Sequence, residues 1–105
     1  MLDIPRNRVI LSASKAFDED QPYENGPTEI KVFNTVTVYR YYGHSIAFKY
    51  SNGAVYLANN RKFDYDVKQR LNSIKGVSLK AKAKKWYLNG KLWGGTLIQI
   101  KRKRG

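Results

Sequence analysis

The sequence predicts an α+β fold, in which an antiparallel sheet of five to six strands carries one short helix on one face. Three observations support this prediction. From residue 29 onward, short segments rich in valine, threonine and tyrosine alternate with turn residues, as strands and hairpins do. Two Asn-Gly pairs, at 52–53 and 89–90, separate apolar stretches as tight hairpin turns do. Residues 66–75 show the apolar spacing of a helix.

The first half of the predicted sheet ends in a hairpin. Strands are expected at residues 30–33, 36–42 and 46–50, before Asn52-Gly53. Both residues of this pair tolerate positive φ, so they favour a two-residue type I′ turn. In that register Lys49 lies opposite Tyr56 on one face, and the other face covers the core with Ile46, Phe48, Tyr50, Val55 and Leu57.

A short helix follows the hairpin. Asp66 and Gln69 have the spacing of a capping box, in which each side chain satisfies a backbone N–H group at the start of the helix. Gly76 is expected to end the helix. An apolar stripe at i, i+4 and i+7 is expected to face the sheet and consists of Val67, Leu71 and Ile74.

After the helix, apolar residues alternate with lysines. One face carries Val77, Leu79, Ala81 and Ala83, and the other carries Lys80, Lys82 and Lys84. Lys85 breaks the alternation, which predicts a turn or bulge between Lys82 and Lys85. The hairpin at Asn89-Gly90 then sets Trp86 directly opposite Trp93. This arrangement favours a structural cross-strand pair over base stacking for the two tryptophans.

The chain divides into three parts. Residues 1–28 are predicted to be an irregular N-terminal segment, because turn residues interrupt it together with the acidic cluster Asp18, Glu19, Asp20 and Glu24. Residues 29–100 form a single α+β domain, whose last strand covers residues 96–100. Residues 101–105 form a basic tail.

Composition excludes several classes of site. There is no cysteine, which removes disulfides, thiolate metal sites and a cysteine nucleophile. His44 is the only histidine, so a histidine metal cluster is excluded, and we expect its imidazole to be polar surface. No apolar run approaches the roughly 20 residues that span a bilayer. We therefore expect no cofactor, no metal site and no membrane partner.

The net charge of +12 is confined to one part of the chain. Residues 1–60 contain six basic and six acidic residues, whereas residues 61–105 contain fourteen basic residues and only two acidic ones, Asp64 and Asp66. Flat aromatic side chains are interleaved with this charge. A positive field with stacking surfaces suits a nucleic acid, either DNA or RNA.

Cations that could contact phosphates gather after residue 60. The candidates are Arg61, Lys62, Lys80, Lys82, Lys84, Lys85, Lys91, Lys101, Arg102, Lys103 and Arg104. The alternative is a solvated face that keeps the protein soluble and protects an edge strand with lysines. The lack of compensating acids favours nucleic acid. The N-terminal acidic cluster could fold back on these cations and compete with the ligand, or form a solvated loop.

Tyrosines are the candidates for base stacking. Tyr39, Tyr41 and Tyr42 cannot all be buried in a sheet with one covered face, so at least one of them should face water. Ordinary β-propensity is the alternative explanation for their presence. Arg40 lies among them, and Tyr56 is similarly placed on the next predicted hairpin. We therefore add Arg40, Tyr41 and Tyr56 to the candidate binding residues.

Three stretches resemble a small uncharacterised domain of bacteriophages and prophages. That domain has a Tyr-Gly-x-x-Ile-Ala turn, a helix with an Arg-Leu-Asn core and a late Trp-Tyr pair. The matching stretches here are Tyr41-Tyr42-Gly43-His44-Ser45-Ile46-Ala47, Lys68-Gln69-Arg70-Leu71-Asn72 and Trp86-Tyr87-Leu88-Asn89-Gly90. The resemblance covers roughly residues 39–95. It implies a phage accessory protein and carries no activity with it.

Two non-enzymatic functions follow from these observations. The first is a nucleic-acid-binding phage accessory protein, located in the cytoplasm of the bacterial host, that uses a C-terminal basic surface and exposed aromatic rings. The second is a phage-encoded inhibitor whose basic surface docks on an acidic region of a host protein, such as a defence nuclease. Exposed edge strands also make a homodimer plausible.

A third hypothesis is enzymatic. Glu29 and Lys31 have the Glu-x-Lys spacing of metal-dependent nucleases of the restriction type, and Asp18 or Asp20 could supply a second carboxylate for Mg²⁺. The spacing arises by chance in most charged strands, and the chain is short for that fold. We therefore expect no catalytic residues.

Overall fold

The computed structural model describes residues 5–59 and 64–100. It has an α+β fold of two helices, a six-stranded antiparallel sheet and a separate three-stranded sheet. The elements in chain order are α1 (Pro5–Asp18), β1 (Tyr23–Asn25), β2 (Thr28–Val32), β3 (Val36–Tyr41), β4 (His44–Tyr50), β5 (Val55–Leu57), α2 (Tyr65–Asn72), β6 (Leu79–Lys82), β7 (Lys85–Leu88), β8 (Lys91–Leu92) and β9 (Ile98–Ile100).

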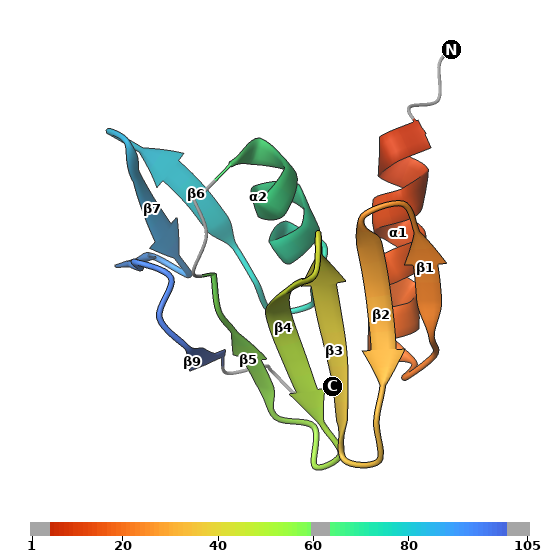
Figure 1. Cartoon of the computed structure of the whole chain (residues 1–105). Coiled ribbons are helices and arrows are strands. Elements are labelled where there is room, and N and C mark those ends of the chain that lie inside the picture. The colour runs from red at the N-terminus through yellow and green to blue at the C-terminus, as the bar shows by residue number, and fades with distance from the viewer. Residues whose placement is uncertain (1–4, 60–63, 101–105) are drawn as a thin grey trace.

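The six-stranded sheet has one covered and one open face. Its strand order is β1-β2-β3-β4-β5-β9, and both helices lie behind it in Figure 1. On the helix side, Ile30, Tyr39, Ala47 and Leu57 form one row of neighbouring strands, and all four are buried. The second sheet, β6-β7-β8, stands beside α2 at one end of the molecule (Figure 1).

The N-terminal segment is more regular than predicted. Residues 1–28 were expected to be irregular, and a single helix was expected in the whole fold; both expectations are wrong, because α1 and β1 lie in this segment. Four apolar side chains of α1 recur on one helical face and are buried, namely Ile10, Ala13, Ala16 and Phe17. The turn residues follow this helix and do not break it. Asp20, with φ of 56°, ends it as a left-handed cap, and Gln21 N–H donates to the carbonyl of Ala16.

The hairpin between β4 and β5 has a different register from the predicted one. Asn52-Gly53 does not form a two-residue type I′ turn: Gly53 has φ of +90°, and its N–H donates to the carbonyl of Tyr50. The observed pairs are Lys49 with Val55, Phe48 with Tyr56, and Ala47 with Leu57. A slip of one residue exchanges the two faces of a strand. Phe48 and Tyr50 therefore share the open face with Tyr56, instead of covering the core.

The helix α2 begins two residues earlier than predicted. Its N-cap is Asp64, whose side chain accepts a hydrogen bond of 2.9 Å from the N–H of Val67. The expected cap, Asp66, lies inside the first turn. Val67, Leu71 and Ile74 are all buried, as predicted, but Ile74 lies two residues beyond the end of the helix.

A polar cluster fastens the end of α1 to the sheet. The Thr37 hydroxyl donates to Asp20 at 2.6 Å, and the Lys49 ammonium lies 3.3 Å from the same carboxylate. The hydrogen bond from Thr37 and the charge of Lys49 hold the pKa of Asp20 below its ordinary value of 3.8, against a smaller opposing effect of burial. A carboxyl with a lowered pKa stabilises the fold above that ordinary value and loses this contribution as the pH falls through the folded pKa.

We therefore expect Asp20→Asn to lower the free energy of unfolding at neutral pH by about 0.5–1 kcal/mol, since water screens this exposed carboxylate. Asparagine tolerates the left-handed backbone of Asp20, so the change reports on the charge. Urea unfolding of both proteins should show the difference disappearing below pH 3.8. Glu19→Gln, a neighbouring exposed carboxyl, is the control. A difference that persists in acid would contradict the assignment.

Candidate nucleic-acid interface

Five of the predicted lysines lie on the three-stranded sheet β6-β7-β8 or, for Lys84, in the turn between β6 and β7. We call this sheet with its turn the lysine sheet, and its lysines are Lys80, Lys82, Lys84, Lys85 and Lys91. Cross-strand pairing sets Lys80 opposite Tyr87, and Lys82 opposite Lys85, on its outer face. Tyr87 is paired in turn with Leu92, whose side chain is 62% exposed. The opposite face carries Leu79 and Leu88, both buried, and also Lys91, which is paired with Leu88. The outer face therefore combines cations with an aromatic ring and an exposed leucine.

The lysine sheet is held firmly against the rest of the protein. Asn72 of α2 bonds to Leu79 in both directions, accepting from its N–H at 2.6 Å and donating to its carbonyl at 2.9 Å. Asn89 accepts from the N–H of Ser78 and donates to the carbonyl of Gly76. These contacts imitate strand pairing, so they fix the direction in which the lysines project.

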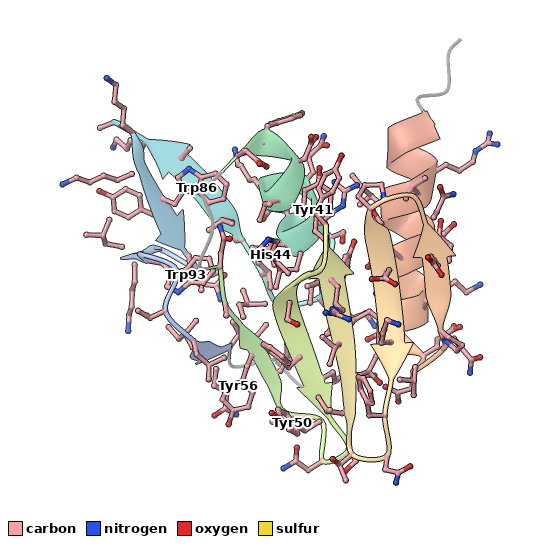
Figure 2. All side chains as sticks on the ribbon, viewed as in Figure 1. Tyr41, His44, Tyr50, Tyr56, Trp86 and Trp93 are labelled. Atoms are coloured by element: carbon pink, nitrogen blue, oxygen red, sulfur yellow. The ribbon has the colours of Figure 1, made fainter. Side chains whose placement is uncertain are left out.

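The second hairpin confirms its predicted register. Asn89 and Gly90 both have positive φ, of 49° and 88°, and the N–H of Trp93 donates to the carbonyl of Trp86. Trp93 is buried, and its indole N–H donates to the carbonyl of Thr96 at 2.8 Å. Trp86 is half-buried and packs against the core (Figure 2). The geometry therefore supports a structural role for Trp86 and Trp93.

The turn between β6 and β7 holds its residues in a strained backbone conformation and brings like charges together. Ala83 and Lys84 have φ of 53° and 64°, in the left-handed region that glycine and asparagine favour. Lys82 and Lys85 face each other across the same turn, where like charges repel. A strained backbone of this kind costs about 1–3 kcal/mol for each residue, and such residues cluster at binding and catalytic sites.

Relief of this strain should be measurable. We expect Ala83→Asn combined with Lys84→Gly to raise the free energy of unfolding by about 1–2 kcal/mol, because Asn-Gly suits a two-residue turn with positive φ at both positions. Lys84→Gln removes the same charge without relieving the backbone and serves as the control. Thermal unfolding of the three proteins compares them. Equal stability of the two variants would contradict the interpretation.

No carboxylate masks the lysine sheet among residues 5–59 and 64–100. Three acidic residues form ion pairs elsewhere: Asp18 with Lys75 at 3.8 Å, Asp20 with Lys49 at 3.3 Å, and Glu29 with Lys31 at 3.8 Å. Within the same described residues, none of the five lysines takes part in an ion pair, and all five are exposed. The N-terminal acidic cluster therefore does not fold back on this surface.

The remaining predicted residues do not join the lysine sheet. Tyr41 is only 6% exposed and lies beneath the guanidinium of Arg70, 4.2 Å from its ring centre, so its predicted availability for stacking is wrong. Tyr42, at 63% exposed, is the tyrosine of that strand that faces water. Arg40 is half-buried, and its Nη2 donates to the carbonyl of Gly43. The other candidate cations lie outside the described residues: Arg61, Lys62, Lys101, Arg102, Lys103 and Arg104.

Tyr56 lies on the open face of the large sheet, with its ring 5.6 Å from that of Tyr50. Sequence reasoning missed Tyr50, because the wrong hairpin register put it in the core. It also missed Tyr87 and Leu92 as partners of the lysines. The signal for these two was present, since the Asn89-Gly90 register and the turn after Lys82 together place them on the lysine face.

The carboxylates of the nuclease hypothesis are not brought together. Glu29 lies on the open face of β2 next to Lys31, whereas Asp18 and Asp20 are bound to lysines at the end of α1. No group of three His, Cys, Asp or Glu side chains that could hold a metal ion occurs in the described part of the chain. The predicted metal-binding arrangement of Glu29 with either aspartate is therefore not formed.

Two further findings complete the description. Among residues 5–59 and 64–100, neither helix has the length and apolar character needed to cross a bilayer. Comparison of the whole chain with known proteins found no matching family model, no matching curated protein and no matching solved structure.

Proposed function

We propose that this protein is a non-enzymatic nucleic-acid-binding accessory protein of a phage or prophage, acting in the bacterial cytoplasm. The observation that carries the proposal is the outer face of the lysine sheet, where the exposed side chains of Lys80, Lys82 and Lys85 lie on one face without ion-pair partners among the described residues. A phosphate backbone is the ligand that neutralises such a row, since it offers regularly spaced negative charges. The resemblance to a phage domain stays a prediction.

The energetics of the surface support the same ligand. Lys82 and Lys85 repel each other across strained backbone in the free protein. A bound polyanion would remove that repulsion. Release of counterions from the nucleic acid adds a favourable contribution for each phosphate that a lysine neutralises. Lysine is a less specific phosphate ligand than arginine, so we expect little dependence on base sequence from this surface.

Fluorescence anisotropy with labelled single- and double-stranded DNA and RNA, at two salt concentrations, tests the proposal. Binding should weaken steeply with salt, with a slope of log K against log salt of about −0.9 per phosphate contact on duplex DNA and about −0.7 on single strands. Binding that does not respond to salt, or no binding to any of the four nucleic acids, would overturn the proposal.

A second candidate function is inhibition of a host protein, such as a defence or nucleic-acid-processing enzyme, through the same surface. The observation that favours it is Leu92, which is 62% exposed and lies beside Tyr87 among the lysines. An apolar centre with a charged rim is the usual anatomy of a protein interface. A pull-down from nuclease-treated host lysate separates the two functions. Retention of an acidic protein in stoichiometric amount, lost in the Leu92→Ser variant, would favour the inhibitor.

A further inference from the structure

The open face of the six-stranded sheet has a groove that no candidate residue except Tyr56 touches. Its volume is about 520 Å³, and it lies where β4 and β5 meet their connecting turn. Figure 2 shows Tyr50 and Tyr56 side by side at this end of the sheet. The residues that determine its chemistry are Thr35, Phe48, Tyr50, Asn52, Tyr56 and Leu97.

The aromatic rings in this groove are accessible. Tyr50 is 41% exposed, and it meets Tyr56 edge to face, at an interplanar angle of 84°. An edge-to-face pair leaves ring faces available for a third flat group. Phe48, paired with Tyr56 across the strands, is half-buried beside them, and Leu97 is 63% exposed at the rim. A sheet that only needed solubility would carry polar side chains on this face.

The polar groups of the groove are neutral and varied. The Asn52 side chain accepts from the N–H of Ala54 at 2.9 Å through its oxygen, which fixes the amide and leaves its NH₂ group as a donor. The Thr35 hydroxyl can donate or accept. No charged side chain lines the groove. Aromatic walls with a few neutral donors and acceptors match the faces and edges of a nucleobase.

The sequence that follows β9 is strongly basic. Ile100, the last described residue, pairs with Val55, and Val55 is flanked by Ala54 and Tyr56, two lining residues. The next four residues in the sequence are Lys101, Arg102, Lys103 and Arg104. Cations that follow Ile100 in the sequence favour an anionic ligand over a neutral apolar peptide. The volume is also within the range of about 300–1,000 Å³ that small-ligand sites have.

We propose that this groove stacks unpaired bases of a single-stranded nucleic acid, so that the protein prefers single strands to duplexes. The inference rests on the proposed function and assigns its ligand class. Stacking requires a free base face, which a duplex does not offer, whereas the lysine sheet can contact the backbone of either form. The two surfaces can therefore be tested separately.

The test measures anisotropy of a labelled oligothymidine and of a duplex of the same length. Tyr50→Leu keeps an apolar side chain but removes the aromatic face, and should weaken single-strand binding between about fivefold and about a hundredfold. Duplex binding should not change. Tyr50→Trp should bind the single strand at least as tightly as the unchanged protein. Tyr65 on α2 is also exposed, at 62%, so Tyr65→Leu is the control and should behave as the unchanged protein.

If Tyr50→Leu and the unchanged protein bound the single strand with equal affinity, the groove assignment would be overturned. Salt-dependent binding would still uphold the proposed function in that case. If Tyr50→Leu weakened binding to the duplex and to the single strand equally, the groove assignment would also be overturned. The same holds if sedimentation showed that the unchanged protein is a dimer and that Tyr50→Leu abolishes the dimer. Conversely, Tyr50→Leu could selectively lose single-strand binding while lysine substitutions left nucleic-acid binding unchanged. That result would uphold the groove assignment and overturn the role of the lysine sheet. Absence of all nucleic-acid binding would overturn both.

Discussion

Replacement of Lys80, Lys82 and Lys85 together by glutamine is expected to weaken binding to duplex DNA by a factor on the order of a hundred at moderate salt. The three side chains lie on one face of the lysine sheet and have no ion-pair partners among the described residues, so each can contact a phosphate. The salt slope should become shallower by about 2.7, at about 0.9 for each lost contact. Anisotropy titrations at several salt concentrations measure both quantities.

A matched control removes the same charge elsewhere. Lys15, Lys31 and Lys75 are also exposed, but they lie on α1, on β2 and after α2. Their combined replacement by glutamine should change affinity and slope much less. The triple variant of the lysine sheet should be at least as stable as the unchanged protein, because the repulsion between Lys82 and Lys85 is removed. Similar losses in both triple variants would mean that net charge, and not this surface, determines binding.

The two Asn-Gly pairs show where sequence reasoning succeeds and where it stops. The same dipeptide forms a two-residue turn with positive φ at Asn89 and Gly90, and a longer turn with positive φ only at Gly53. Local preference allows both turns. At the first hairpin the contacts on the helix side decide, because Ala47 and Lys49 pair with Leu57 and Val55 on that side, and Lys49 reaches Asp20 there. Asp20 lies far away in the sequence, so the register could not be read from the turn itself.

The helices show a different limit. The apolar stripe of α2 was recognised because Val67, Leu71 and Ile74 have no breaking residues around them. In α1 the stripe of Ile10, Ala13, Ala16 and Phe17 includes two alanines and is followed at once by an acidic turn. Alanine contributes little to a hydrophobic pattern, although it packs closely against a sheet. The helix was therefore readable only with attention to spacing, and the turn residues obscured it.

The basic surface was predictable because strand alternation and turns act locally. Lys80 and Lys82 lie on one face by the period of two, whatever packs beneath them. Burial of Tyr41 was not predictable, because it depends on Arg70, which lies in another element and covers the tyrosine ring. A tyrosine on a strand gives no sign in the sequence of a cation that will meet it from a distant helix.

Arg70 is the residue whose replacement should affect stability most. Its side chain is 4% exposed, and it donates through Nε and Nη2 to the hydroxyl of Thr28, at 3.1 and 2.9 Å. Its Nη1 donates to the carbonyl of Asp66 at 3.0 Å, and its guanidinium lies over the ring of Tyr41. These contacts join α2 to β2 and β3 at a point where Thr28 is fully buried.

We expect Arg70→Ala to lower the free energy of unfolding by about 3 kcal/mol, from the lost packing and the lost hydrogen bonds of a charged donor. Arg70→Lys should be nearly as destabilising, because an ammonium cannot form the planar set of three hydrogen bonds and stack on Tyr41 at the same time. Urea unfolding followed by circular dichroism measures both variants. An Arg70→Lys variant within about 0.5 kcal/mol of the unchanged protein would contradict this role.

Arg70→Met with Thr28→Val separates packing from hydrogen bonding. Methionine fills much of the space of the arginine stem, and valine replaces the hydroxyl that would otherwise be buried without a donor. The double variant should therefore lose less stability than the sum of the two single variants, by about 1 kcal/mol. Strict additivity would mean that the two side chains do not stabilise each other, and that Arg70 acts through the Tyr41 ring and the Asp66 carbonyl alone.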